Sequence, residues 1–432
     1  HYLIEGEKIF ISFGEHDMTE NIVHAVLARL EGAPEGTRGL SLFLVPKIRV
    51  NDDGSLGETN DVVCAGLEEK MGIHGSPTCT MVFGAEGKSH GWLLGRENEG
   101  IRTMFQMMNE ARINVGLQGS ALANAAYQLA LAFAKERVQS KSITAGKDPS
   151  AKATEIINHP DVRQMLMWQK GIAEGTRALL IRTTMFRDLA ESSDTPEERE
   201  KYDDLLGLLT PICKAYCSDQ GFRSAELSLQ TLGGYGYLRE YGVEQHLRDN
   251  KIASIYEGTN GIQALDLVGR KLPAKGGASL KALVGMMMGL IDENKDHEVL
   301  GPSFEHMSAA VNALVDVSTY FATAGAKDPL IPVLNATPYL DLFGQAVVGW
   351  LLLEQATLAY PRLMAICATK GVDGIDVGDA NAMAELCRDD EAKFFFGKIK
   401  VAQFWAHRAL TQVPAKAAAL ELDDTSALEI AF

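Results

Sequence analysis

The chain has 432 residues, of which 46 % are hydrophobic and 23 % are charged, so it is a globular protein large enough for two or three domains. Its formal net charge of -16 disfavours nucleic acid and an anionic membrane surface as main partners, because both would repel it. The longest strongly apolar runs, residues 283–291 and 346–353, are shorter than a bilayer-spanning helix requires. We therefore expect a cytoplasmic protein with no membrane partner.

Residues 1–98 have the pattern of a small antiparallel β-domain. Short runs rich in β-branched and aromatic residues are separated by clusters of Gly, Asp, Asn and Pro; the runs are YLIEGEKIFIS, IVHAVLARL, GLSLFLVPK and TCTMVFGA. A sandwich or a barrel fits this pattern. The chain opens inside the first strand pattern, with neither a Met nor a signal peptide, so we expect that an upstream segment is missing.

From residue 99 onward the apolar residues recur at helical spacing. Residues 99–141 predict two long helices, or one helix broken near its glycines, and residues 142–160 predict a polar loop. Residues 161–193 predict another long amphipathic helix. The run ESSDTPEEREKYD, residues 191–203, is expected to be an acidic connector on the surface, and helices then continue to residue 272.

Proline, lysine and glycine cluster at residues 271–281, which predicts a domain boundary there. The overall prediction is an α+β protein, mainly α: a β-domain over residues 1–98, a helical bundle over 99–272 and a further C-terminal helical domain over 280–432. Cys213 and Cys217 lie four residues apart on one predicted helix face. We expect two small buried side chains there and no metal site.

Two motifs follow one another at the end of the second region. QTLGGYGYLREYG, residues 230–242, places glycines after a helix, where backbone N–H groups can bind a phosphorylated ligand. Taken alone, it is more typical of an ordinary helix C-cap. SIYEGTNGIQ, residues 254–263, places the carboxylate of Glu257 before a glycine turn, which alone is more typical of a helix cap than of a catalytic site.

The combination of QxxGGxGY and IYEGT resembles the acyl-CoA dehydrogenase family. Further landmarks of that family match in the same order: GEKIFIS at 6–12, KMGIHGSPT at 70–78, LLGRENEG at 93–100, NEARINVG at 109–116 and AKERVQSK at 134–141. The resemblance implies an N-terminal helical domain, a middle β-domain and a C-terminal helical domain, of which the first is expected to be absent here. The turn TNG, with Gly261, and the extra C-terminal helices are most similar to the branch typified by 3-methylmercaptopropionyl-CoA dehydrogenase, of bacterial dimethylsulfoniopropionate breakdown.

The resemblance implies an FAD-dependent oxidation of an acyl-CoA thioester to the trans-2-enoyl-CoA. Glu257 matches the base that takes the α-proton, while the β-hydrogen leaves as hydride to flavin N5. The α-hydrogen is barely acidic, so the base would need a pKa raised by desolvation, and the thioester carbonyl would need hydrogen bonds.

Further residues match positions that hold FAD in the family: Phe10, Ser12, Arg137, Gln230, Gly233, Gly234, Thr259 and Asn260. Phe10 and Ser12 would stack on and hydrogen-bond to the flavin, and Arg137 would meet the pyrophosphate. The segment 230–234 would reach the FAD of a neighbouring subunit, which implies a homo-oligomer, either a dimer or a tetramer. His159 matches a residue near the adenine, although a helix start would also explain it.

A second set matches substrate-binding positions: Arg112, Asn109, Ser76 and Gly258. Arg112 belongs to the CoA-binding face of the family. Asn109 stands where an Asp is common, which puts its contact in doubt, and Ser76 would serve equally well in a simple turn. Gly258, next to the base, is expected to touch the substrate.

Three activities fit the motifs. The first is an acyl-CoA dehydrogenase that passes electrons to electron-transfer flavoprotein, and the second is an acyl-CoA oxidase that returns them to oxygen. The third is a DNA-binding flavoprotein of the alkylation-response branch. The retained Glu257 and the acidic balance of the chain weigh against the third, because a DNA-binding protein needs a basic face.

Overall fold

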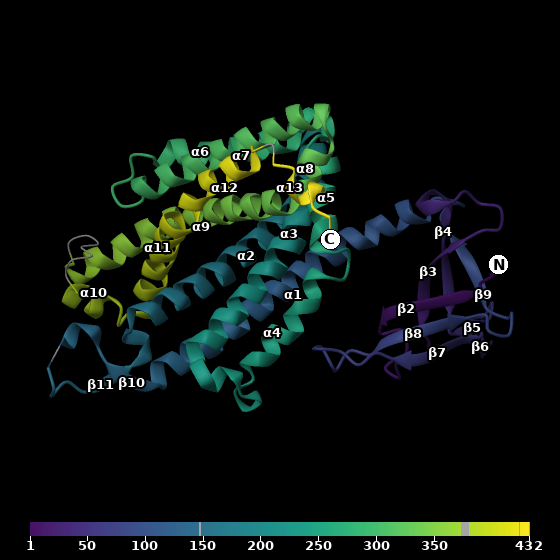
Figure 1. Ribbon diagram of the computed structural model, residues 1–432, viewed down its shortest axis with the longest axis horizontal. Coiled ribbons are helices and arrows are strands. Elements are labelled where there is room, and N and C mark those ends of the chain that lie inside the picture. The colour runs from purple at the N-terminus through teal and green to yellow at the C-terminus, as the bar shows by residue number, and fades with distance from the viewer. Residues whose placement is uncertain (147, 373–379, 423, 432) are drawn as a thin grey trace. The chain divides into compact units, whose positions relative to one another are not determined.

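The computed structural model describes residues 1–432 except 147, 373–379, 423 and 432. The chain divides into two compact units, His1–Ala111 and Arg112–Phe432. Figure 1 labels the strands of the first unit and the helices of the second. The predicted class, α+β with mainly helix, is confirmed.

The first unit is a sandwich of two antiparallel sheets. One sheet has the order β1-β9-β4-β3 and the other β2-β8-β7, and β5 pairs with β6 in a separate ribbon. The strand bounds are β1 Tyr2–Leu3, β2 Gly6–Ser12, β3 Val23–Arg29, β4 Leu40–Pro46, β5 Ile48–Val50, β6 Leu56–Thr59, β7 Val62–Leu67, β8 Thr78–Phe83 and β9 His90–Leu94. Phe43 and Val45 of one sheet share a core with Cys79 and Met81 of the other. Of the two predicted alternatives the sandwich is therefore correct, and the strands of residues 1–111 form no barrel.

The second unit is built from helices, with one short hairpin. Its first helix is α1 Gly100–Glu136, which begins in the first unit, and the hairpin pairs β10 Val138–Lys141 with β11 Ala153–Glu155. The other helices are α2 Pro160–Ser192, α3 Pro196–Leu232, α4 Val243–Lys251, α5 Asn260–Asp266, α6 Ala278–Asn294, α7 Gly301–Lys327, α8 Leu330–Leu334, α9 Ala336–Lys370, α10 Ala380–Leu386, α11 Asp390–Arg408, α12 Val413–Leu420 and α13 Ser426–Glu429. Strand β11 lies within residues 142–160, which were predicted to be a loop, whereas β10 occupies residues that were predicted to be the end of a helix.

One core runs through the second unit. It contains buried residues from α2 and α3 together with residues from α6, α7, α9 and α11. In Figure 1, α9 passes among these helices, and it packs against α2, α3, α7 and α11. Residues 271–281, predicted as a domain boundary, hold a tight turn in which Lys275 and Gly276 have left-handed φ values of 50° and 66°. This turn does not separate two cores, because the helices before and after it pack together.

Helix α9 is apolar because it is surrounded by other helices. By length and composition it could cross a membrane, but 78 % of its most apolar window is buried inside the fold. The run at residues 346–353, predicted to be too short for a span, is part of this 35-residue helix. Trp350 is 2 % exposed, and the Arg182 guanidinium lies 4.8 Å from its ring centroid.

Two local predictions were wrong, each for a physical reason. Helix α1 is unbroken, because Gly116 faces α3 at close range rather than ending the helix. The predicted acidic connector is on the surface as expected, but residues 196–203 form the first two turns of α3, and Glu191 and Ser192 end α2. At the start of α3 the Thr195 side chain accepts a hydrogen bond from the Glu198 N–H at 3.2 Å, Pro196 occupies the first turn, and the acidic residues lie at the positive end of the helix dipole. Cys213 and Cys217 are both fully buried, as predicted.

Candidate active site

Glu257 lies in a strained turn between the 3-10 turn Ile252–Ser254 and helix α5. Both Glu257 and Gly258 have left-handed backbones, with φ values of 55° and 79°. For a residue with a side chain this conformation costs about 1–3 kcal/mol, so it persists only where neighbours hold it. Thr259 holds one end, because its hydroxyl accepts a hydrogen bond from the Ile262 N–H at 3.2 Å and caps α5.

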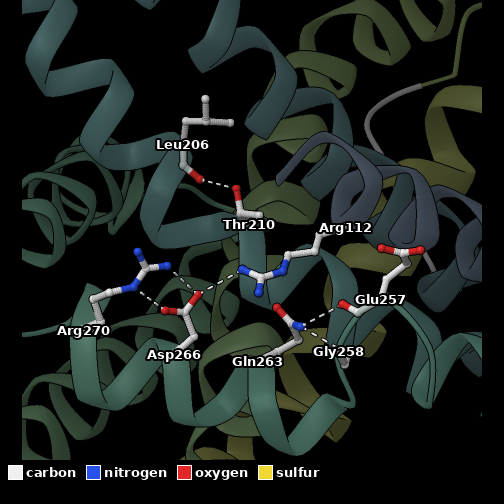
Figure 2. A network of polar contacts seen from close by, with 8 residues as sticks. All are labelled: Arg112, Leu206, Thr210, Glu257, Gly258, Gln263, Asp266 and Arg270. Carbon is white, nitrogen blue, oxygen red and sulfur yellow. Dashed lines mark hydrogen bonds and ion pairs between the residues drawn. The ribbon is translucent and has the colours of Figure 1, made fainter. Parts of the chain in front are cut away.

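The Glu257 backbone and side chain face different surroundings. The Gln263 Nε2 donates to the carbonyl oxygens of Glu257 and Gly258 at 3.3 and 3.2 Å, and Gln263 is fully buried. The Glu257 side chain is exposed, and Figure 2 shows its carboxylate turned away from the Gln263 amide. The backbone of the predicted base is therefore held firmly, while the desolvation expected for its carboxylate has no support in this structure.

A buried polar cluster anchors the residue that follows the turn. Asn260 is 9 % exposed, and its Oδ1 accepts a hydrogen bond from the Lys214 Nζ of α3 at 2.9 Å. Its Nδ2 donates to Asp219 Oδ1 at 2.8 Å and to Ser218 Oγ at 3.0 Å. The Asn260 side chain, predicted to touch FAD, is thus engaged inside the protein, and its contact with the cofactor stays a prediction.

Arg112 lies in a buried ion pair, as Figure 2 shows. Its side chain is 4 % exposed and its Nη1 lies 3.1 Å from Asp266 Oδ2, while Arg270 Nε donates to Asp266 Oδ1 at 2.6 Å. Burial raises the pKa of Asp266, but the hydrogen bond from Arg270 and the charges of both arginines outweigh it, so this pKa is lowered. The guanidinium of Arg112, predicted to face CoA, lies inside the helical unit.

Most of the predicted FAD residues of the helical unit line one pocket of about 720 Å³. Arg137 comes from the end of α1, and Gln230, Gly233 and Gly234 come from the end of α3, which Gly233 caps with a φ of 61°. His159, at the start of α2, lines the same pocket. A guanidinium beside a glycine turn suits a phosphorylated ligand, so these residues fit the diphosphate of FAD. The Gly233 N–H itself donates to the Gln230 carbonyl.

Sequence reasoning missed two residues of these clusters. Tyr235 lines the pocket, where its hydroxyl accepts a hydrogen bond from Arg137 Nη1 at 3.3 Å and its ring centroid lies 4.8 Å from the guanidinium carbon. Its place inside the GGYG motif was the available signal. Lys214 is fully buried, and the signal was a single lysine inside the apolar run PICKAYC.

The predicted residues of the first unit lie on separate features. Phe10 occupies a bulge in β2, where Lys8 pairs with Met81 and Ile11 with Cys79, so one extra residue is inserted. The bulge gives Phe10 a φ of 58° and leaves its ring 68 % exposed, which suits stacking on a flat ligand. Ser12, two residues on, is also exposed.

Ser76 and Asn109 have less specific surroundings. Ser76 closes a turn, since its N–H donates to the Ile73 carbonyl at 3.0 Å and its own carbonyl accepts from Lys70 Nζ at 2.8 Å. This supports the turn role that the sequence left open. Asn109 is half-buried on α1, and its Oδ1 is a buried oxygen without a hydrogen bond among the described residues.

Comparison with known proteins identifies the family. A model described as the acyl-CoA dehydrogenase C-terminal domain matches residues 98–272, and one described as acetyl-CoA dehydrogenase C-terminal-like matches residues 283–431. A butyryl-CoA dehydrogenase of Syntrophomonas wolfei is 39 % identical over 99 % of this chain and 67 % of its own length. The chain belongs to the acyl-CoA dehydrogenase family. The predicted family is therefore confirmed, and with it the class of FAD-dependent oxidoreductases.

A second curated relative and a solved structure are also similar to this chain. The 3-methylmercaptopropionyl-CoA dehydrogenase of Ruegeria pomeroyi is 39 % identical over 96 % of this chain and 66 % of its own length. A crystal structure of an acyl-CoA dehydrogenase complexed with FAD from Bacillus anthracis has a TM-score of 0.71 at 18 % identity, covering 99 % of this chain and 65 % of that one. The chain thus spans about two thirds of the relatives it matches. The family models begin and end near the predicted regions 99–272 and 280–432, although the structure packs both into one unit.

Proposed function

We propose that the protein containing this chain oxidises an acyl-CoA thioester to its trans-2-enoyl-CoA, with Glu257 as the base. The observation that carries the proposal is the strained turn of Glu257 and Gly258 in a member of this family, since strained backbone conformations need support from their surroundings and cluster at functional sites. In the reaction the α C–H bond breaks and its proton passes to the Glu257 carboxylate. The β-hydrogen leaves with its electron pair, and the α–β bond becomes double.

FAD, when bound, supplies the acceptor for that hydride. The part of this chain is to bind and orient the cofactor and to place the base. Arg137, beside the glycine turn of Gly233 and Gly234, would hold the diphosphate, and Phe10 and Ser12 would contact the flavin ring. Glu257 would hold the transferred proton on its carboxylate. A carboxylate serves here because one of its oxygens can accept the proton directly from the α carbon.

The substrate we propose is a CoA thioester with a short, unbranched acyl chain. Two relatives at 39 % identity support this, one named for butyryl-CoA and one for 3-methylmercaptopropionyl-CoA. Both acyl groups are small and linear, and both carry hydrogens on the α and β carbons. 3-Methylmercaptopropionyl-CoA, from dimethylsulfoniopropionate breakdown, is the more specific proposal, and the TNG turn supports it. The butyryl-CoA dehydrogenase also matches the C-terminal helices, so these helices do not decide between the two substrates.

Anaerobic flavin bleaching tests the activity and the base together. We expect the full-length yellow protein to lose its visible flavin absorbance when mixed with butyryl-CoA or 3-methylmercaptopropionyl-CoA. Glu257→Gln should keep FAD and abolish bleaching, because an amide cannot take the proton. Bleaching that persists in Glu257→Gln would contradict the assignment of the base. Comparing the two thioesters at equal concentration decides between the substrates.

The electron acceptor and the assembly are part of the same proposal. We propose electron-transfer flavoprotein as the acceptor and a cytoplasmic homo-oligomer, a dimer or a tetramer, as the working form. The oligomer is supported by the match of Gln230, Gly233 and Gly234 to the family segment that reaches a neighbouring FAD. Oxygen consumption without added acceptor would favour the oxidase instead, and salt-sensitive DNA binding without any bleaching would favour the DNA-binding flavoprotein. Light scattering gives the oligomeric state, and cell fractionation gives the location.

A further inference from the structure

Lys214 is an unusual residue for the interior of a helical unit. It lies on α3 and is 0 % exposed, although lysines are almost never fully buried unless they are paired. Its Nζ donates to the Asn260 Oδ1 at 2.9 Å. Burial lowers the pKa of Lys214 to about 8, and the negative charges of Asp219 and Glu257 oppose that effect. The turn that carries the base is thus linked to a buried cation.

Asn260 is suited to bridge Lys214 and Asp219. The Oδ1 of its amide accepts from the ammonium, and the Nδ2 donates to the Asp219 carboxylate at 2.8 Å. A residue with one accepting end and one donating end satisfies both charged neighbours. An Asp at this position would place a second carboxylate against Asp219, and an aliphatic residue would leave both neighbours without this bridge. The chemistry of the cluster therefore fixes how the Asn260 side chain is turned.

Other contacts hold the same turn from different sides. The Tyr256 hydroxyl donates to Gln118 of α1, and the Gln263 amide donates to the carbonyls of Glu257 and Gly258. Residues 256–260, the base turn, are thus fastened to α1, α3 and α5. In the contact to α3, Lys214 and Asn260 are buried, whereas Asp219 lies at the exposed edge of the cluster.

We propose that Lys214 is a positioning residue that acts through Asn260 and Asp219 to fix the base turn, so that Glu257 meets the α-hydrogen of the substrate. The proposal rests on the proposed function. It adds a role for residues that do not touch the reacting atoms. Proton transfer requires the carboxylate within hydrogen-bond reach of the proton, and a shift of about 1 Å can slow a reaction by about 100-fold.

The test exchanges the amide of Asn260 and the carboxylate of Asp219 in the full-length holoenzyme. Asn260→Asp places a carboxylate beside Asp219, and it should slow anaerobic flavin reduction by butyryl-CoA by about 100-fold. Adding Asp219→Asn gives a double variant in which the new amide donates to the new carboxylate, while Lys214 still faces an acceptor. We expect reduction at least about tenfold faster than in Asn260→Asp alone, because residues of one network are coupled. Asn260→Ser, which adds no charge, should also be slow and serves if Asn260→Asp does not fold.

Lys214→Met removes the cation at similar length, and Lys400→Met is its matched control. Lys400 is a partly buried lysine of α11, whose pKa is lowered by burial and whose Nζ donates to Gln403 Oε1 at 3.1 Å, outside the base turn. We expect Lys214→Met to slow flavin reduction about 100-fold and Lys400→Met to leave it unchanged. Rates should be compared well below the melting temperature of every variant, together with FAD content and the Kd for butyryl-CoA.

The pattern of rate and binding separates positioning from a purely structural role. The proposal is supported if Lys214→Met and the Asn260 variants reduce flavin more slowly while their FAD content and their Kd for the thioester stay at the wild-type values. It is further supported if the double variant recovers rate. The proposal is overturned if Lys214→Met and the Asn260 variants reduce flavin at the wild-type rate. It is also overturned if they lose FAD instead of rate, since Asn260 would then act on the cofactor. Bleaching in Glu257→Gln would contradict the proposed base itself, so the two failures are distinguishable.

Discussion

Two glycine-to-alanine substitutions should change stability in opposite directions, although both lie inside helices. Gly116 is buried where α1 crosses α3, and a Cβ added to it would lie 2.4 Å from the Cys213 carbonyl oxygen and 3.2 Å from Leu180 Cδ2. Gly285 is exposed on α6, and a Cβ there would meet no atom within 4 Å. The pair thus compares one substitution with and without a packing conflict.

The magnitudes follow from helix propensity and from crowding. Alanine is favoured over glycine by about 1 kcal/mol inside a helix, so Gly285→Ala should stabilise the protein by about that amount. At Gly116 the obstacle is a backbone carbonyl, which moves only if the helix moves, so the overpacking cost should be about 3 kcal/mol. Subtracting the helix gain leaves Gly116→Ala about 2 kcal/mol less stable than wild type.

Thermal and urea unfolding followed by circular dichroism measure the difference. With about 2 °C per kcal/mol for a large unit, Tm should fall by about 4 °C in Gly116→Ala and rise by about 2 °C in Gly285→Ala. Equal stabilisation of both variants would refute the close approach of α1 and α3. Because Cys213 precedes Lys214, we also expect Gly116→Ala to slow flavin reduction.

The remaining predictions concern residues of the site. Asp266→Asn leaves the Arg112 charge buried without its carboxylate and should cost about 3 kcal/mol in urea unfolding at pH 7. Because the pKa of Asp266 is lowered, its contribution is present above the ordinary carboxyl value and is lost as pH falls through the folded pKa, so variant and wild type should converge in acid. Thr259→Ala removes the α5 cap and should cost about 1 kcal/mol by the same measurement. Arg137→Met should weaken FAD binding by about tenfold or more in fluorescence titration, while Tyr235→Phe, which keeps the ring, should change it less.

The sequence predicted the regular parts of the fold because local patterns determine them. Short runs rich in β-branched and aromatic residues predicted the strands of residues 1–98, and helical spacing predicted the long helices from residue 99 onward. The residues at which helices begin and end were harder to predict. A break was expected near the glycines of residues 99–141, and Pro196 was taken as part of a connector, although Gly116 serves a helix contact and the proline begins a helix. A single sequence does not show which neighbour a small residue faces.

The residues of the candidate site were also only partly predictable from the sequence. The resemblance of the combined motifs to the acyl-CoA dehydrogenase family pointed to Glu257, Arg137 and the glycine turn at 233–234, whereas each motif alone was more typical of a helix cap. Only the tertiary structure brought Arg137 and the glycine turn into one pocket and gave Glu257 a left-handed backbone. It alone placed Lys214 in the interior beside Asn260, 46 residues away along the chain. The burial of a charged group, and the presence of a partner for it, depend on residues that are distant in sequence. Packing therefore decides whether a buried charge is stabilised by a partner, and the local sequence pattern does not.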